Sequence, residues 1–319
     1  MKIFSFLRLI RLQNLLIIIF MYCIIKFFLI NQFIAEPALN NFNFFLFLLS
    51  TVLISAAGYV INDIYDVKID QINKNNDVII NTKIKSSQAL ISYLILNFFS
   101  FVTIAYVSIQ IGKPIFSLIF LYSIFILWRY SKELKKKFAR GNVVVSWLIA
   151  LSIINIGLFD VLPVMTKDNS SPIVFKIIMA FSLFAFLTNL SREIIKDVED
   201  EEGDKQLNAN TLIIKFGLKK TKQVINFLNV SILVLIGLWQ YFQYSFNQTS
   251  FENNQKIEIW GTDINSIFYT FALQILVLFL IFKTFFAKSK NDFSFLSQLS
   301  KVIMIFGILS ILIFTKNYF

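Results

Sequence analysis

Residues 42–70 of the chain read FNFFLFLLSTVLISAAGYVINDIYDVKID. The first twenty, residues 42–61, carry no charged side chain, and about 20 apolar residues in a helix are enough to cross the hydrocarbon core of a bilayer. Polar residues follow at once and include three carboxylates, those of Asp63, Asp66 and Asp70. This stretch therefore predicts a membrane-spanning helix that ends in a group of acidic side chains.

The composition of the whole chain agrees with a membrane protein. Of 319 residues, 57% are hydrophobic and 15% are charged, and 38 are Phe. Such a chain is too apolar for an ordinary soluble domain and too rich in aromatic residues to be disordered. It has no His and one Cys, Cys23, which excludes imidazole chemistry, disulfides and Cys-rich metal sites. Carboxylates, Lys, Arg, Tyr and amides remain for chemistry.

Apolar stretches long enough for membrane helices recur along the chain. Nine qualify: 12–35, 42–61, 89–111, 115–128, 143–162, 173–190, 224–242, 267–287 and 302–315. Lys26 lies inside the first and fits lipid only near a helix end, where its amine can reach the interface. That stretch is also too long for the apolar part of a cleavable signal peptide, so we expect a retained helix. The prediction is an all-α bundle of nine transmembrane helices forming one domain, 1–319.

The distribution of basic residues predicts the orientation. The N-terminal segment and the loops 62–88, 129–140, 191–222 and 283–301 hold 24 of the 30 Lys and Arg residues. Basic loops tend to remain in the cytoplasm, so we expect a cytoplasmic N-terminus and a C-terminus outside. The net charge of +11 then indicates topology and lipid-headgroup contact, and no nucleic-acid partner.

Two acidic runs lie on this basic side and share one spacing. Residues 63–70 and 197–204 both read Asp-x-x-Asp-x-x-x-Asp, the second through Asp197, Asp200 and Asp204. On a helix, positions i, i+3 and i+7 share one face. Grouped carboxylates repel one another unless a cation compensates them, and Mg²⁺ favours such oxygen ligands together with substrate phosphate. Either run alone fits a solvated helix end, but the pair indicates a magnesium-diphosphate site.

Basic side chains near these runs are candidates for binding the diphosphate. Residues 129–142 read RYSKELKKKFARGN, and the alternative interpretation of this loop is topogenic charge with anionic-lipid contact. Cations there stabilise a departing diphosphate. The candidates are Tyr130 and Lys135 in this loop and Lys74, Arg192 and Lys196 beside the acidic runs.

These motifs together resemble those of the UbiA-type intramembrane prenyltransferases. Asn62 to Asp70 matches the family's NDxxDxxxD motif, and 192–204 resembles its second acidic motif. Tyr130, Ser131, Leu134 and Lys135 resemble its YSxxLK element, and Arg11 with Asn14 resembles its Arg-x-x-Asn. The chain departs from the family's pattern after Asn73, where Lys74 is not followed by Pro, and at Asn210, where Lys is usual.

The resemblance implies nine helices around a central cavity, with Mg²⁺ holding a polyprenyl diphosphate at its cytoplasmic mouth. The allylic C–O bond breaks there and a lipophilic acceptor attacks the cation, which is shielded from water. The implied location is a bacterial or archaeal cell membrane. The implied metal ligands are Asp63, Asp66, Asp70, Asp197, Asp200 and Asp204. The implied substrate contacts are Arg11, Asn14, Asn62, Lys74, Tyr130, Lys135, Arg192 and Lys196.

The acceptor and the rival functions stay open at this level. The string Arg-Glu-Ile-Ile-Lys-Asp-Val-Glu-Asp at 192–200 most resembles the geranylgeranylglycerol-phosphate geranylgeranyltransferases, which make an ether. Enzymes that prenylate aromatic acceptors such as homogentisate and chlorophyllide share much of it. The strings of CDP-alcohol phosphotransferases do not occur. A cation-coupled transporter is the alternative outside enzymes, although its acids normally lie near the bilayer midplane.

Overall fold

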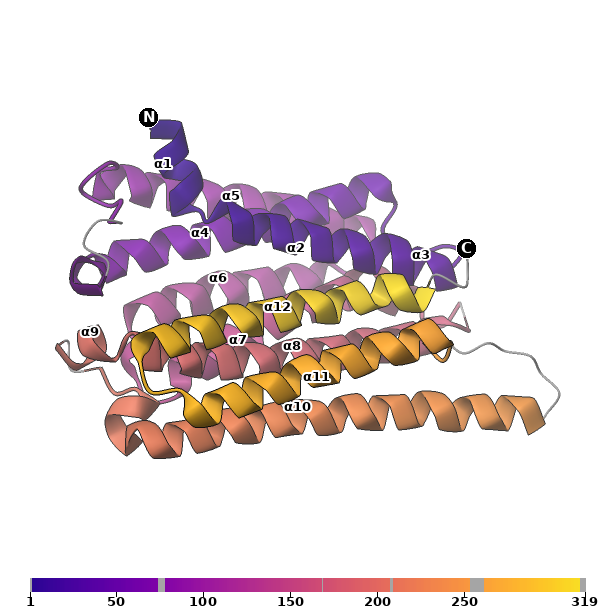
Figure 1. The fold of residues 1–319 in the computed structure, drawn as a ribbon. Helices are drawn as coiled ribbons and strands as arrows, with labels where there is room; N and C mark the ends of the chain where they lie inside the picture. Colours follow the sequence, from indigo (N-terminus) through magenta and orange to yellow (C-terminus); the bar gives the residue numbers. More distant parts are fainter. Residues whose placement is uncertain (1, 74–77, 168, 207–208, 253–260, 316–319) are drawn as a thin grey trace.

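A computed structural model of the chain describes residues 2–73, 78–167, 169–206, 209–252 and 261–315. These residues are almost entirely helical, with one isolated β-bridge between Ile80 and Ile84 as the only extended pairing among them. The helices run nearly parallel to one another in a single elongated bundle (Figure 1). The architecture is therefore all-α, as the sequence predicts.

Nine helical segments within the described residues are long and apolar enough to cross a membrane. Five of them are single α-helices: α5 (Ser86–Gln110), α8 (Ser171–Glu199), α11 (Ile264–Phe286), α12 (Lys290–Thr315) and the long α4 (Asn41–Asn73). The first combines α2 (Leu12–Ile24), the π-helical η1 (Ile25–Ile30) and α3 (Asn31–Phe33). The fourth joins η2 (Pro114–Phe116) to α6 (Ser117–Lys132), and the fifth joins α7 (Arg140–Ile156), η4 (Gly157–Val161) and η5 (Leu162–Val164). The seventh is α10 (Leu212–Glu252), bent at Gly217.

The predicted count of nine is confirmed for this part of the chain, and the ends of the elements differ from the prediction. The fourth segment covers Pro114–Lys132 and is longer than the predicted stretch. Three short helices lie outside the spans: α1 (Lys2–Leu9), η3 (Leu134–Lys136) and α9 (Glu201–Gln206). Helices α1 and α9 lie at one end of the bundle, whereas α12 finishes at the opposite end (Figure 1).

Helix α8 occupies the middle of the packing. It contacts α7, α10 and α12, while α4 packs along α5 and α6. Apolar side chains from α8, α10, α11 and α12 form one buried cluster, which includes Ile195, Ile232, Val277 and Leu296. Many large apolar side chains are also exposed on the outside of the bundle, as expected for helices that pack in lipid.

Aromatic rings fill the interior in a second cluster. The Phe159 ring lies 5.0 Å from Phe47 and 5.9 Å from Phe120, centroid to centroid, and Tyr22 packs on Phe47 at 5.6 Å. All four side chains are almost fully buried. These rings come from four different spans, so their packing holds the N-terminal span against the centre of the bundle.

Lys26 does not reach the interface as the sequence suggests. Its side chain is 1% exposed, and its Nζ donates to Asp160 Oδ2 at 2.7 Å and to the Leu39 carbonyl at 2.6 Å. Asp160 in turn accepts from the Leu39 amide at 2.7 Å. A buried charge is costly in apolar surroundings unless it is paired and hydrogen-bonded, and both conditions are met here. The first span therefore keeps its lysine by ion pairing within the protein.

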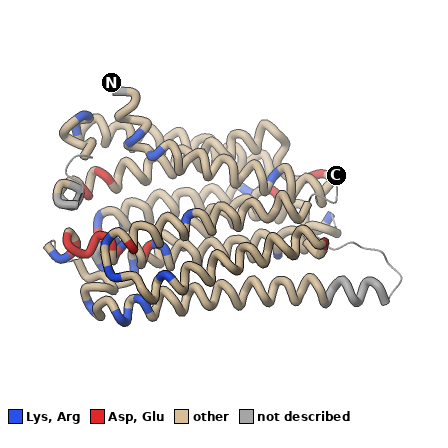
Figure 2. The backbone as a smooth tube through the Cα atoms, in the orientation of Figure 1, with Lys and Arg blue, Asp and Glu red and all other residues tan. Residues whose placement is uncertain are grey.

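Charged residues gather mainly at the end of the bundle where α1 and α9 lie (Figure 2). Both acidic runs and most basic residues are found there, and the long middle of the bundle is nearly free of charge (Figure 2). The segregation is that of a protein whose middle lies in hydrocarbon and whose ends meet water. The assignment of this end to the cytoplasm stays a prediction.

Candidate active site

The first acidic run is helical throughout. Helix α4 continues to Asn73, so it carries Asp63 and Asp66 past the apolar stretch without a break. Asp66 is only 3% exposed, and Asn62 donates from Nδ2 to its Oδ2 at 2.7 Å. The side chain of Asp70 and the whole of Lys74 lie outside the described residues. Asp63 and Asp66 are therefore the carboxylates of this run that the structure positions.

The second acidic run is not one continuous helix, which corrects the expectation from its spacing. Helix α8 ends at Glu199, Asp200 adopts φ −97° and ψ 11°, and α9 begins at Glu201. Four consecutive acids, 199–202, crowd this point, and their repulsion together with the negative end of the α8 dipole disfavours further helix. Asp197 thus stays on α8 while Asp204 lies on α9.

The two runs meet despite this break. Helix α9 contacts α4, and Asp204 interacts electrostatically with both Asp66 and Lys135. Burial and the Asp200 carboxylate raise the pKa of Asp204 to about 6, Lys135 opposes the shift and Asp66 adds to it. Carboxylates from distant parts of the sequence therefore share one site with an excess of negative charge.

Lys135 provides the main positive charge between the runs. It comes from η3, and its Nζ forms an ion pair with Asp66 Oδ2. Gly141, in the first turn of α7, lies directly against this segment, because a Cβ built there would be 2.9 Å from the Lys135 Cα. The close approach of α7 thus fixes the backbone of Lys135, and only glycine leaves room for it.

Arg11 forms an ion pair with Asp63, the other carboxylate of the first run that the structure positions. Its Nη2 donates to Asp63 Oδ1 at 3.1 Å, and its guanidinium lies 4.9 Å from the centre of the Tyr59 ring. The residue joins α1 to α2 in a left-handed conformation, with φ 51°. Non-glycine residues adopt this conformation at a cost in free energy. The turn is nevertheless formed here, and it directs the Arg11 guanidinium to Asp63.

Asparagines hold two of the carboxylates. Besides the contact of Asn62 with Asp66, Asn142 of α7 donates from Nδ2 to Asp197 Oδ2 at 2.7 Å. Asn142 was not among the residues expected from the sequence. Its position in the loop 129–142 was the only indication in the sequence. Because Asn142 belongs to no motif, its contact with Asp197 becomes evident only from the packing of α7 against α8.

The predicted cations Arg192 and Lys196 are engaged by a residue that the sequence did not indicate. Both pair with Glu193 Oε1, at 3.2 and 3.3 Å. The Nε of Arg192 is buried without a hydrogen-bond partner, which leaves one donor for an oxygen ligand. Tyr130 lies within electrostatic range of Lys135, Asp66 and Asp197, so it faces the same site.

Asn14 takes a different direction from Arg11. It interacts with the Tyr59 hydroxyl, and its Oδ1 accepts from Lys301 Nζ at 3.3 Å. Lys301 belongs to α12, at the far end of the sequence. The structure therefore brings the Arg-x-x-Asn element, α4 and α12 together beside the acidic runs.

The carboxylates that the structure describes do not by themselves form a closed metal site. Within the residues that the structure describes, no three acidic or Cys side chains are close enough to hold one ion. Their oxygen chemistry fits Mg²⁺, which commonly takes one or two protein carboxylates and completes its shell with water and substrate phosphate. Two features fit a metal ion shared between protein and substrate. Asp204 and Asp66 bring an excess of negative charge together, and the Arg192 Nε has no hydrogen-bond partner.

Comparison with known sequences gives consistent relatives. The UbiA prenyltransferase family matches residues 23–250. A protein of Methanosphaera stadtmanae named digeranylgeranylglyceryl phosphate synthase is 35% identical over 63% of this chain and 68% of its own length. One of the same name from Methanococcus aeolicus is 33% identical over 73% of this chain and 76% of its own. The protein of the same name from Sulfolobus acidocaldarius is 35% identical over 62% of this chain and 66% of its own length.

Solved structures agree over nearly the full length. One concerned with digeranylgeranylglyceryl phosphate synthase in membranes aligns over 99% of both chains, with 25% identity and a TM-score of 0.68. A UbiA homolog from Archaeoglobus fulgidus, bound to GPP and Mg²⁺, shares the fold at 15% identity and a TM-score of 0.57, over 96% of this chain and 99% of its own. With nine apolar helices among the residues that the structure describes, this chain is an integral multi-pass membrane protein that belongs to the UbiA prenyltransferase family.

Proposed function

We propose that the protein transfers a geranylgeranyl group from geranylgeranyl diphosphate to the free glycerol hydroxyl of geranylgeranylglyceryl phosphate, forming an ether lipid. The observation that carries this proposal is the meeting of the two acidic runs around Lys135, with Asp204 in electrostatic contact with Asp66. The relatives named digeranylgeranylglyceryl phosphate synthase support the acceptor.

The reaction needs a leaving group with its charge neutralised and a shielded carbon. The C1–O bond of the prenyl diphosphate breaks, and both electrons go to the diphosphate. The glycerol oxygen of the acceptor then forms a bond to C1 and releases its proton to a base. Exclusion of water protects the allylic cation from hydrolysis, and apolar helices around the site supply that exclusion.

Mg²⁺, when bound, neutralises the phosphate oxygens and draws electrons toward the leaving group. We assign its ligands, direct or through water, to the six carboxylates named above: Asp63, Asp66, Asp70, Asp197, Asp200 and Asp204. Arg11, Asn62, Tyr130, Lys135, Arg192 and Lys196 are assigned to the diphosphate, and the substrate contacts of Asn14 and Lys74 stay predictions. The Lys135 ammonium forms an ion pair with Asp66 in the structure. When substrate binds, this ammonium moves from the Asp66 carboxylate to a phosphate oxygen.

The transporter alternative has less support. Both acidic runs lie at one end of the bundle (Figure 2). The ion sites of transporters, in contrast, lie near the bilayer midplane. Interleaved cations such as Lys135 and Arg11 also suit an anionic substrate better than a metal ion alone.

The test is product analysis with the purified protein in lipid bilayers. It receives labelled geranylgeranyl diphosphate and Mg²⁺ with geranylgeranylglyceryl phosphate, homogentisate or hydroxybenzoate in parallel, and lipids are identified by mass spectrometry. We expect the ether product from the glyceryl phosphate and no aromatic product. Product from an aromatic ring alone contradicts the assigned acceptor, and product with none of them contradicts the assigned reaction.

A further inference from the structure

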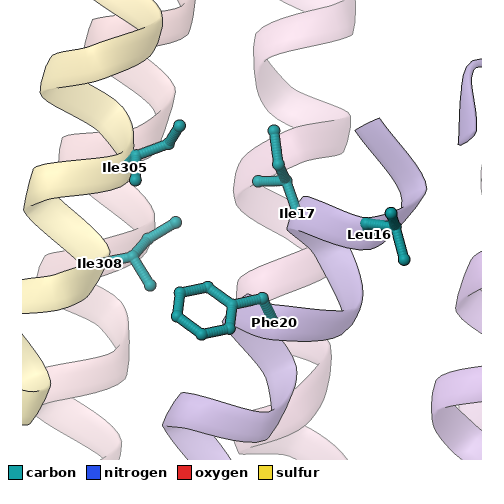
Figure 3. Close-up of a pocket in the computed structure, with 5 residues that line it drawn as sticks. All are labelled: Leu16, Ile17, Phe20, Ile305 and Ile308. Atoms are coloured by element: carbon teal, nitrogen blue, oxygen red, sulfur yellow. The ribbon is translucent and has the colours of Figure 1, made fainter. Parts of the chain in front are cut away.

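Two cavities between the helices differ in the chemistry of their walls. The larger, of about 190 Å³, lies between α2 and α12, and its wall is wholly apolar: Leu16, Ile17, Phe20, Ile305 and Ile308 (Figure 3). The smaller, of about 10 Å³, lies where α8, α10, α11 and α12 meet. Its wall combines polar with apolar side chains: Thr188, Asn229, Ser300, Ile232, Val277, Leu280 and Ile303. The smaller cavity is therefore the one that offers hydrogen bonds.

The Asn229 amide provides an unused hydrogen-bond donor at this smaller cavity. The side chain is fully buried, with 0% exposure, and its Oδ1 accepts from the Ser191 hydroxyl at 3.0 Å. Among the residues that the structure describes, none supplies an acceptor for its Nδ2. A buried donor without an acceptor is unfavourable, and native proteins satisfy nearly all such groups with protein atoms or ordered water. Asn229 therefore needs an acceptor within the cavity.

The two hydroxyl groups at the cavity remain available as acceptors. Thr188 donates from Oγ1 to the Phe184 carbonyl at 2.8 Å, and Ser300 donates from Oγ to the Leu296 carbonyl at 2.8 Å. A hydroxyl has one hydrogen and two lone pairs, so both groups use their hydrogen within their own helix and can still accept. The cavity thus combines a free donor from α10 with acceptor oxygens from α8 and α12.

We propose that this cavity binds one water molecule, which accepts from Asn229 Nδ2 and donates to Thr188 Oγ1 and Ser300 Oγ. A volume of about 10–15 Å³ is enough for one water, which needs two to four polar partners. The cavity volume of about 10 Å³ excludes a larger ligand. A metal ion does not fit, because the described side chains that line the cavity include no carboxylate and the amide N–H repels a cation.

The bound water joins α8 to α10 and α12 close to the candidate active site. Ser191, which holds the Asn229 amide, directly precedes Arg192, and Asp197 follows within about two turns of α8. Hydrogen bonds through the water therefore stabilise this part of α8 within the buried apolar cluster of α8, α10, α11 and α12. The site does not depend on the proposed reaction, because it uses no residue assigned to the metal or the substrate.

A crystal structure of the full chain, at a resolution that shows ordered water, tests the occupant. We expect one density peak at hydrogen-bond distance, about 2.5–3.2 Å, from Asn229 Nδ2 and from both hydroxyl oxygens. In Asn229→Leu, which removes the donor from a side chain of similar size, the peak should disappear. A cavity without density while other buried waters are resolved overturns the inference, as does a direct hydrogen bond from Asn229 to either hydroxyl.

Denaturant unfolding in detergent tests the hydrogen bonds separately. Thr188→Val and Ser300→Ala each remove one acceptor for the water. The matched controls are Thr284→Val and Ser310→Ala, because these hydroxyls are also buried and donate to a carbonyl of their own helix but do not line the cavity. We expect each site variant to raise the unfolding equilibrium constant about fivefold more than its control, as loss of one buried hydrogen bond does. Equal changes within either pair overturn the inference.

Discussion

Lys135 is the residue through which one loop controls both acidic runs. It pairs with the buried Asp66 and interacts with Asp204, so its backbone position decides whether the charges meet. Gly141 sets that position, because an added Cβ would be 2.9 Å from the Lys135 Cα and 3.2 Å from the Leu134 carbonyl oxygen. No motif marks Gly141, and the sequence could not indicate this contact.

We predict that Gly141→Ala lowers kcat/KM for the prenyl diphosphate about tenfold or more, because small misplacement of a binding group is costly in catalysis. The added methyl group must displace the η3 backbone, which carries the Lys135 ammonium away from Asp66. Steady-state kinetics in bilayers checks this prediction.

Gly237→Ala is the matched control. A Cβ at Gly237, in α10, meets no atom within 4 Å, and alanine favours a helix. We expect wild-type kinetics and unchanged or higher stability. Wild-type kinetics in Gly141→Ala would contradict the role given to this contact.

Residues of the candidate site differ in how far the sequence reveals them. The sequence shows recognisable runs that contain Asp63, Asp66, Asp197, Asp204, Tyr130 and Lys135, and the structure brings these residues within electrostatic range of one another. Asn142 and Lys301 were missed, because their partners become neighbours only when helices pack. Glu193 was missed although its partners Arg192 and Lys196 lie beside it on α8. The pair Lys301 and Asn14 joins positions 287 residues apart.

At the scale of elements, two π-helical segments deserve comparison. Lys26 lies in η1 and Asp160 in η4, and the two side chains pair at 2.7 Å. π-Helical turns are rare and occur often where a side chain has a special task. Here both hold a buried ion pair that fixes the chain after the first span through Leu39.

We predict that Lys26→Met and Asp160→Leu each lower the free energy of unfolding by about 3–5 kcal/mol, because each leaves a buried charge without its partner. The double variant should recover more than half of this loss, since no unpaired charge remains. Denaturant unfolding in detergent measures the three variants. A double variant as unstable as the sum of the single ones would contradict this account.

Hydropathy predicted the nine spans because twenty apolar residues have few alternatives to a membrane helix. It did not predict where helices end. Helix α4 continues through the first acidic run, and α8 stops within the second. These outcomes depend on charge crowding and on contacts with η3 and α9, which no window of local hydropathy contains.

At the scale of the molecule, charge gathers mainly at one end of the bundle (Figure 2), and aromatic rings pack in the interior. In the proposed mechanism the substrate completes the coordination of Mg²⁺, because among the described residues no three carboxylates lie close enough to hold one ion. Binding of metal and of diphosphate is therefore linked, and each must strengthen the other by the same factor.

We predict that Mg²⁺ binds weakly to the protein alone and about tenfold or more tightly when a non-reactive prenyl diphosphate analogue is present, because phosphate oxygens complete its shell. Calorimetric titration in nanodiscs measures both affinities. Equal Mg²⁺ affinity with and without the analogue would show a preformed protein cage and contradict the shared site.

The most direct test is a double-mutant cycle on kcat/KM for geranylgeranyl diphosphate, with Asp66→Asn, Asp197→Asn and the double variant. Glu36→Gln, an exposed acid in the loop after the first span, is the control and should behave as wild type. If both runs bind one diphosphate, kcat/KM falls about a hundredfold or more in each single variant. In the double variant it falls little further than in the worse single variant. Full turnover in either single variant, or losses that multiply as for independent sites, would contradict the account.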